Sequence, residues 1–141
     1  MPLVRKARTF ASLPRRDQIA IAHIAIVALA AEAGLRVSKP TRLARRFGLT
    51  VGRDAAPPAP KRLPALSDDE ARALRAATMI FGSVMSERAC LRYSLVAGHV
   101  LRRRRPVLRF AATRRDGAVH AHAWIEVDGV RIDWADASTF T

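Results

Sequence analysis

The sequence has 141 residues, half of them hydrophobic, and its 25 Lys and Arg against 12 Asp and Glu give a formal net charge of +13. This length suffices for one domain with a hydrophobic core. The single cysteine excludes an internal disulfide and is typical of a reducing compartment, so we expect a cytoplasmic protein. The positive charge favours an acidic partner, either a peptide, another subunit or nucleic acid, but a genome rich in G and C gives the same composition.

Residues 1–50 form a predicted N-terminal helical segment with a basic start. Ile19–Ala31 is an apolar run interrupted only by His23. A membrane span needs about 20 residues, so we expect a buried amphipathic helix that closes at Gly34, with His23 in or near the core. A basic start and an apolar run are also found in secretory signals, but the long basic stretch and the histidine argue against export.

A short basic helix and a connector follow. Pro40 is predicted to begin the helix and Gly48 to end it. Three of its arginines form either a solvated face or a phosphate-contacting one: Arg42, Arg45 and Arg46. Residues 51–66 hold four prolines among small residues and are predicted to be a stiff, extended connector.

Residues 67–141 are predicted to be the core domain, which begins with two helices. Ser67 and Glu70 have the spacing of a capping box and predict a helix over Asp68–Phe81. A second helix is predicted over Glu87–Arg103, before a proline that cannot continue it.

The only cysteine, Cys90, lies in the first turn of this second helix, for which Ser86 is the predicted cap. There the positive end of the helix dipole favours a thiolate. Ser94 lies one turn later on the same face. Arg102 to Arg105 lie at the negative end, where they complement the dipole or attract an acidic peptide.

Three antiparallel strands are predicted to follow and to pack on the Cys90 helix, giving an α+β architecture. Val107–Thr113 is the first strand. Val119–Val127 is the second, with apolar side chains on one face and polar ones on the other. Asp128 and Gly129 are typical of a two-residue type I′ turn into the third strand.

The register of this hairpin singles out one aspartate. If Val127 lies opposite Val130, then Asp133 lies on the same face as His122, as its diagonal neighbour. Asp136 has the opposite parity. Cys90, His122 and Asp133 thus supply a thiol, an imidazole and a carboxylate, the parts of a cysteine nucleophile, its base and the group that orients the base.

Other residues and chemistries compete with this interpretation. His120 and Trp124 share the face of His122 and are candidates to line a substrate groove. Cys90, His120 and His122 are possible zinc ligands, but they lack the paired spacing of structural zinc sites. We therefore expect no metal and no cofactor.

The two motifs also resemble a known family. Cys90-Leu-x-x-Ser94-Leu, followed 32 residues after the cysteine by His122 in Ala-His-Ala-Trp and then by Asp133, resembles the transglutaminase-like, papain-like cysteine peptidase of lasso peptide biosynthesis, often called the B protein. In this family the three equivalent residues are nucleophile, base and orienter. Many members have a proline where this chain has Arg92.

The resemblance implies a function and partners. Members of the family remove the leader from a ribosomally made precursor peptide before a separate, asparagine-synthetase-like cyclase closes the macrolactam ring. No stretch of this chain resembles the family's leader-recognition module, so the resemblance implies a separate recognition protein as well.

Two rival functions remain open. The same three residues suit acyl transfer to an amine, or amidase chemistry, on another peptide substrate. A basic nucleic-acid-binding module is the non-enzymatic alternative, but the sequence has few aromatic residues for base stacking and no groove-reading motif.

Overall fold

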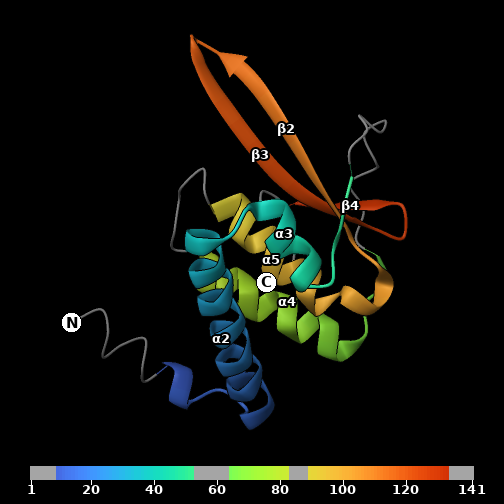
Figure 1. The fold of residues 1–141 in the computed structure, drawn as a ribbon. Coiled ribbons are helices and arrows are strands. Elements are labelled where there is room, and N and C mark those ends of the chain that lie inside the picture. The colour runs from blue at the N-terminus through green and yellow to red at the C-terminus, as the bar shows by residue number, and fades with distance from the viewer. Residues whose placement is uncertain (1–8, 53–63, 83–88, 134–141) are drawn as a thin grey trace, which may run out of the picture.

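The computed structural model describes residues 9–52, 64–82 and 89–133, which fold into a group of helices beside a small sheet (Figure 1). The α+β prediction is confirmed. The helices are α2 (Arg15–Val37), α3 (Pro40–Arg46), α4 (Asp68–Phe81), α5 (Ala89–Val100) and a 3₁₀ turn, η1 (Arg102–Arg104). The strands are β1 (Thr50–Val51), β2 (Val107–Arg115), β3 (Ala118–Val127) and β4 (Val130–Ile132), in the order β1-β2-β3-β4.

Helix α2 is longer than the predicted apolar run and passes through Gly34 to Val37. Gly34 was expected to end this helix, but it lies where α3 approaches α2. A Cβ at position 34 would lie 2.5 Å from Cδ1 of Leu43, so glycine here permits close packing of two helices.

The apolar residues of α2 are divided between two faces. Ile24, Val27 and Ala31 are buried, whereas Ile19, Ile26 and Leu29 are 66–69% exposed. His23 is exposed, so its predicted place in or near the core is wrong, because it lies on the outward side of the helix.

Helix α2 also has the length and composition of a membrane span, the one such helix in the described part of the chain. It packs within the domain, however. Its neighbours are α4 and α5, and ion pairs join Asp17 to Arg72, at 3.0 Å, and Glu32 to Arg92.

Helix α4 has the predicted bounds and the predicted capping box. The Glu70 backbone N–H donates to Ser67 Oγ at 3.3 Å, and the Ser67 N–H donates to Glu70 Oε2 at 2.9 Å. The buried stripe of the helix includes Leu74 and Phe81 and faces α5, which is itself almost wholly buried between α4 and the sheet.

Arg104 joins three parts of the fold. Its guanidinium donates to both carboxylate oxygens of Glu70, at 2.9 and 2.6 Å, and to Asp128 Oδ2 at 3.1 Å. These bonds raise the pKa of Arg104 and hold the pKa of Glu70 below its usual value. The capping box of α4 is thereby fixed to the turn between β3 and β4.

We expect Arg104→Ala to lower the urea concentration at the midpoint of unfolding, because it removes a two-pronged ion pair with Glu70. The matched control is Arg103, the exposed residue directly before Arg104 in η1. Arg103→Ala should change the free energy of unfolding by less than about 0.5 kcal/mol. Urea unfolding followed by circular dichroism measures both. Equal losses in the two variants would contradict this role for Arg104.

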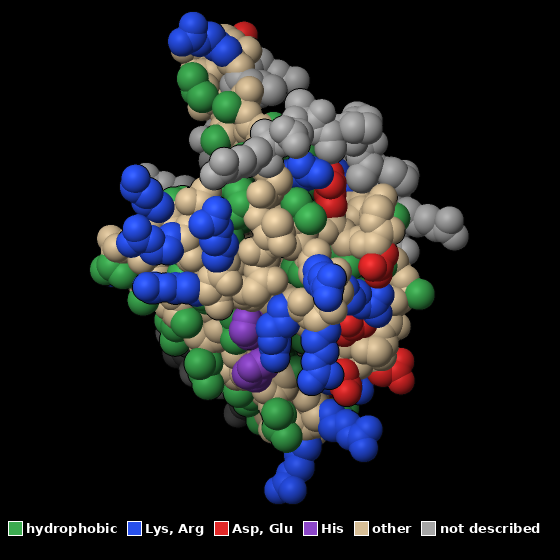
Figure 2. All heavy atoms as spheres, turned by 45° about the vertical axis from the view of Figure 1, so that its right-hand side comes forward, with side chains coloured by type: hydrophobic (Ala, Val, Ile, Leu, Met, Phe, Trp, Pro, Cys, Tyr) green, Lys and Arg blue, Asp and Glu red, His purple; other side chains and the backbone are tan. Residues whose placement is uncertain are grey.

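The region around η1 differs from the sequence prediction. The helix that carries Cys90 ends at Val100, and the chain continues through η1 to Arg105, which has a left-handed φ of 54°. Arg102 of η1 lies close to the end of α3, since a Cβ at Gly48 would meet the Arg102 side chain. Figure 2 shows Lys and Arg side chains spread over the face that it views, whereas most of the Asp and Glu side chains lie toward its right-hand side.

The hairpin register is confirmed: Val127 pairs with Val130, Glu126 with Arg131 and Ile125 with Ile132. Asp128 and Gly129 have φ values of 52° and 74°, as a type I′ turn requires. The sheet is mixed and not purely antiparallel, because β1 adds a parallel strand beside β2. This two-residue strand was too short to predict from its sequence.

Strands β2 and β3 form a long arm that projects beyond the helices (Figure 1). The inner half of β3 alternates as predicted, with Ala123, Ile125 and Val127 buried, whereas Ala118 to Ala121 are all exposed. The arm therefore packs on α5 only near its base.

Candidate active site

Cys90 is the second residue of α5 and is 6% exposed. The predicted cap, Ser86, and the predicted first residue, Glu87, lie outside the described residues. One turn later, Ser94 Oγ donates to the backbone carbonyl of Ala123 at 3.2 Å. This buried hydrogen bond joins the helix that carries Cys90 to the strand position beside His122, and so it sets the two segments against each other.

His122 and Asp133 are in contact. His122 Nε2 lies 2.8 Å from Asp133 Oδ2, as expected for diagonal neighbours on one face of the hairpin. Asp133 directly follows β4 and is 1% exposed. Because the carboxylate lies on Nε2, the other ring nitrogen, Nδ1, remains for proton exchange. Asp136 lies outside the described residues.

Arg131 also binds this carboxylate. Its Nε and Nη2 donate to Asp133 Oδ2 at 3.1 and 2.5 Å, and its guanidinium carbon lies 4.3 Å from the centre of the Trp124 ring. The Trp124 ring in turn stacks on His122, with centroids 5.9 Å apart. Trp124 and Arg131 thus pack beside the His122–Asp133 pair.

Asp133 also lies close enough to α5 to affect Tyr93. Burial raises the pKa of Tyr93 to about 12, and the negative charge of Asp133 contributes to the shift. Tyr93 is three residues after Cys90 and on the same side of the helix. The carboxylate therefore lies within electrostatic range of the Tyr93 hydroxyl.

Cys90 and His122 line one cavity of about 550 Å³. Helices α2 and α5 and strands β2 and β3 all contribute to its wall, and its remaining lining residues are Glu32, Leu35, Arg36, Pro40, Leu91, Arg92, Phe110, Ala121 and Ala123. His120 and Trp124, the predicted groove residues, are not among them. His120 is exposed on the projecting arm, and Trp124 packs against His122 and Arg131.

Arg92 forms an ion pair at this cavity. The Arg92 guanidinium contacts the Glu32 carboxylate, and Arg36 lies 3.5 Å from the same group. The hydrogen bond from Arg92 is the largest cause that lowers the pKa of Glu32. Arg92 thus fixes α2 to α5 two residues after Cys90. The sequence gives no signal for this pairing, since the partners are 60 positions apart.

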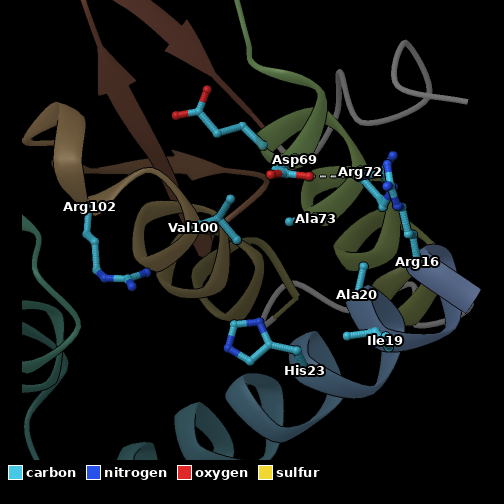
Figure 3. Close-up of a pocket in the computed structure, with 10 residues that line it drawn as sticks. Arg16, Ile19, Ala20, His23, Asp69, Arg72, Ala73, Val100 and Arg102 are labelled. Atoms are coloured by element: carbon cyan, nitrogen blue, oxygen red, sulfur yellow. Dashed lines mark hydrogen bonds and ion pairs between the residues drawn. The ribbon is translucent and has the colours of Figure 1, made fainter.

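A second hollow, of about 680 Å³, lies between α2, α4 and the end of α5 (Figure 3). His23 and Ile19 face it from α2, and Val100 and Arg102 from the other side. Its carboxylates are occupied, because Asp69 pairs with Arg72 and Glu70 with Arg104. It contains neither the thiol nor the His122–Asp133 pair, and its residues do not form a nucleophile and base.

No three His, Cys, Asp or Glu side chains form a potential metal site in the described part of the chain. The groups at the first cavity are of the types that nucleophilic acyl transfer needs: a thiol and an imidazole that line the same cavity, and a carboxylate on the imidazole. This chemistry does not depend on a bound cofactor.

Arg131 is expected to hold Asp133 in position beside His122. In an acyl-transfer reaction at Cys90, Arg131→Leu should therefore lower turnover by about 10²-fold with little change in the KM for the substrate. Arg131→Lys keeps the charge but loses the fork and should recover part of the rate. Arg109, whose ion pair with Glu126 at 3.0 Å lies in the same sheet, supplies the control. If Arg109→Leu costs as much turnover as Arg131→Leu, the effect comes from general damage to the sheet.

Comparison with known proteins identifies one family model that matches the chain. It is the model of the transglutaminase-like superfamily, and it covers residues 34–141. The match includes Cys90, His122 and Asp133, and it begins near the end of α2. No curated protein and no solved structure shows significant similarity.

Proposed function

The chain belongs to the transglutaminase-like superfamily, whose members are generally cysteine-dependent enzymes, and from this premise we propose a specific activity. The protein is a cysteine peptidase that removes the leader from a ribosomally made lasso precursor peptide before macrolactam cyclisation. The observation that carries the proposal is the 2.8 Å contact of His122 with the buried Asp133, on a cavity that Cys90 shares.

The proposed mechanism assigns one role to each of these three residues. His122 takes the proton of the Cys90 thiol on Nδ1, while Asp133 holds Nε2 and thereby the tautomer of the ring. The thiolate attacks the carbonyl of the last leader residue. Backbone N–H groups at the start of α5 stabilise the oxyanion. His122 then gives its proton to the leaving amine, and water releases the leader from the sulfur.

The lasso assignment rests on sequence motifs. The leader peptidases of that pathway carry similar motifs to the two in this chain, Cys90-Leu-x-x-Ser94-Leu and Ala-His122-Ala-Trp. This resemblance is narrower than membership of the superfamily. The Ser94 bond to Ala123 supports a link between the two motifs, since it joins them in space. Arg92 departs from the family pattern, and its pairing with Glu32 gives the departure a structural role.

The proposal includes partners and a compartment. A separate recognition protein delivers the leader, and an asparagine-synthetase-like cyclase consumes the core peptide. The exposed arginines around η1 and the end of α3 attract an acidic leader. The protein acts in the cytoplasm, where its single thiol stays reduced.

The test is to search the neighbouring genes for a short precursor peptide and a small recognition protein, to incubate the protein with that peptide, with and without the recognition protein, and to weigh the products. Hydrolysis predicts a leader with a free carboxyl end and an intact core peptide. An adduct of the leader with an added amine would instead identify an acyltransferase. An unchanged precursor in every mixture would contradict the proposal.

A further inference from the structure

The cavity beside Cys90 has mainly apolar walls. Six of its lining residues are apolar: Leu35, Pro40, Leu91, Phe110, Ala121 and Ala123. Its volume of about 550 Å³ lies within the range of about 300–1,000 Å³ that is typical of ligand sites. Since one side chain fills only a fraction of it, the space suits two neighbouring residues of a peptide.

We propose that this cavity binds large apolar side chains of the peptide segment that Cys90 acylates, and thereby selects where the substrate is cut. The inference rests on the proposed peptidase function and adds the substrate class. It excludes a preference for glycine-rich or positively charged residues in the segment of the peptide that Cys90 acylates.

Two strand residues shape the recess. Ala121 and Ala123 face it from β3 with minimal side chains, and so leave space that a larger residue would fill. Phe110 lies opposite Ala123 on β2 and remains 44% exposed. An aromatic ring held partly in solvent beside a nucleophile provides contact area that a ligand can cover.

The carboxylate that lines the cavity does not offer a site for a positively charged side chain. The Glu32 carboxylate is occupied by Arg92 and Arg36, and Arg92 is half-buried in that pair. A substrate ammonium group would therefore enter an apolar recess without a partner, at a desolvation cost. Apolar side chains carry no such cost.

The experiment measures covalent labelling of Cys90 by two peptidyl acyloxymethyl ketones, one with a Leu-Phe segment and one with Gly-Gly. In the reaction the sulfur forms a bond to the ketone methylene, the carboxylate leaves, and the thiol proton passes to His122. Intact-mass spectrometry gives the rates. The wild type should react with the Leu-Phe probe at least about tenfold faster than with the Gly-Gly probe.

The test variant is Ala121→Phe, which fills the recess from an exposed strand position that tolerates an aromatic residue. It should lose about tenfold or more in the Leu-Phe rate but react normally with iodoacetamide, which is too small to need the recess. Val119→Phe is the matched control: it lies on the same strand and face, is 62% exposed and does not line the cavity. Its rates should equal those of the wild type.

The outcomes separate this inference from the proposed function. Equal rates with both peptidyl probes, together with fast alkylation by iodoacetamide that depends on His122, would overturn the apolar subsite alone. An equal loss in Val119→Phe would also overturn it. Alkylation that does not depend on His122, or no labelling by any probe, would contradict the peptidase itself.

Discussion

Replacement of Cys90 by alanine is expected to lower the turnover of leader cleavage by about 10⁶-fold, because no other group that lines the cavity can form the acyl intermediate. The residual rate should be the same with and without the recognition protein. Mass spectrometry of the precursor peptide after prolonged incubation measures the loss.

The fold should survive this change. Cys90 is a small buried residue, so Cys90→Ala should cost only about 1 kcal/mol of stability, and the circular dichroism spectrum should match that of the wild type. The variant should still bind the precursor peptide, which a pull-down detects. Cleavage that persists in the alanine variant would show that the thiol is not the nucleophile.

Asp133→Asn has the second largest expected effect. An amide keeps the size of the carboxylate but can hold the imidazole in the wrong tautomer, and turnover should fall by about 10⁴-fold. The KM should change little, because Asp133 is buried behind His122 and does not line the cavity. Steady-state kinetics on the precursor peptide separates the two parameters.

The control for this variant lies on the same sheet. Glu126→Gln removes the negative charge that pairs with Arg109 but leaves His122 and Asp133 in place, so turnover should fall by less than about tenfold. If both substitutions lower turnover equally, Asp133 has no special relation to the imidazole.

The contact between His122 and Asp133 was predictable because strand geometry is periodic. Alternation gave the face of each residue, and the Asp128-Gly129 turn set the register, so the diagonal pairing followed from counting along two strands. Arg131 lies two residues before Asp133 on that same face, and the same count identifies it as a neighbour of the carboxylate. The count does not show whether its guanidinium binds the carboxylate of Asp133 or that of Glu126, its cross-strand partner.

Contacts between distant elements were not predictable. The Arg92–Glu32 pair and the cavity walls depend on how α2 packs against α5, which helical periodicity does not specify. The apolar run correctly predicts the helix α2. Because apolar residues lie on both faces of this helix, the sequence does not show which face is buried, and the predicted burial of His23 is wrong for that reason. The role of Phe110 depends on the approach of α2 and α5 to β2 and has no local sequence signal.

The central claim is that His122 activates the thiol of Cys90, and the rate of Cys90 alkylation by iodoacetamide at pH 7 tests it without any knowledge of the substrate. His122→Ala should lower this rate by about 10²-fold, while His23→Ala, at an exposed histidine of α2, should leave it unchanged. Alkylation of the His122→Ala protein at the wild-type rate would contradict the claim.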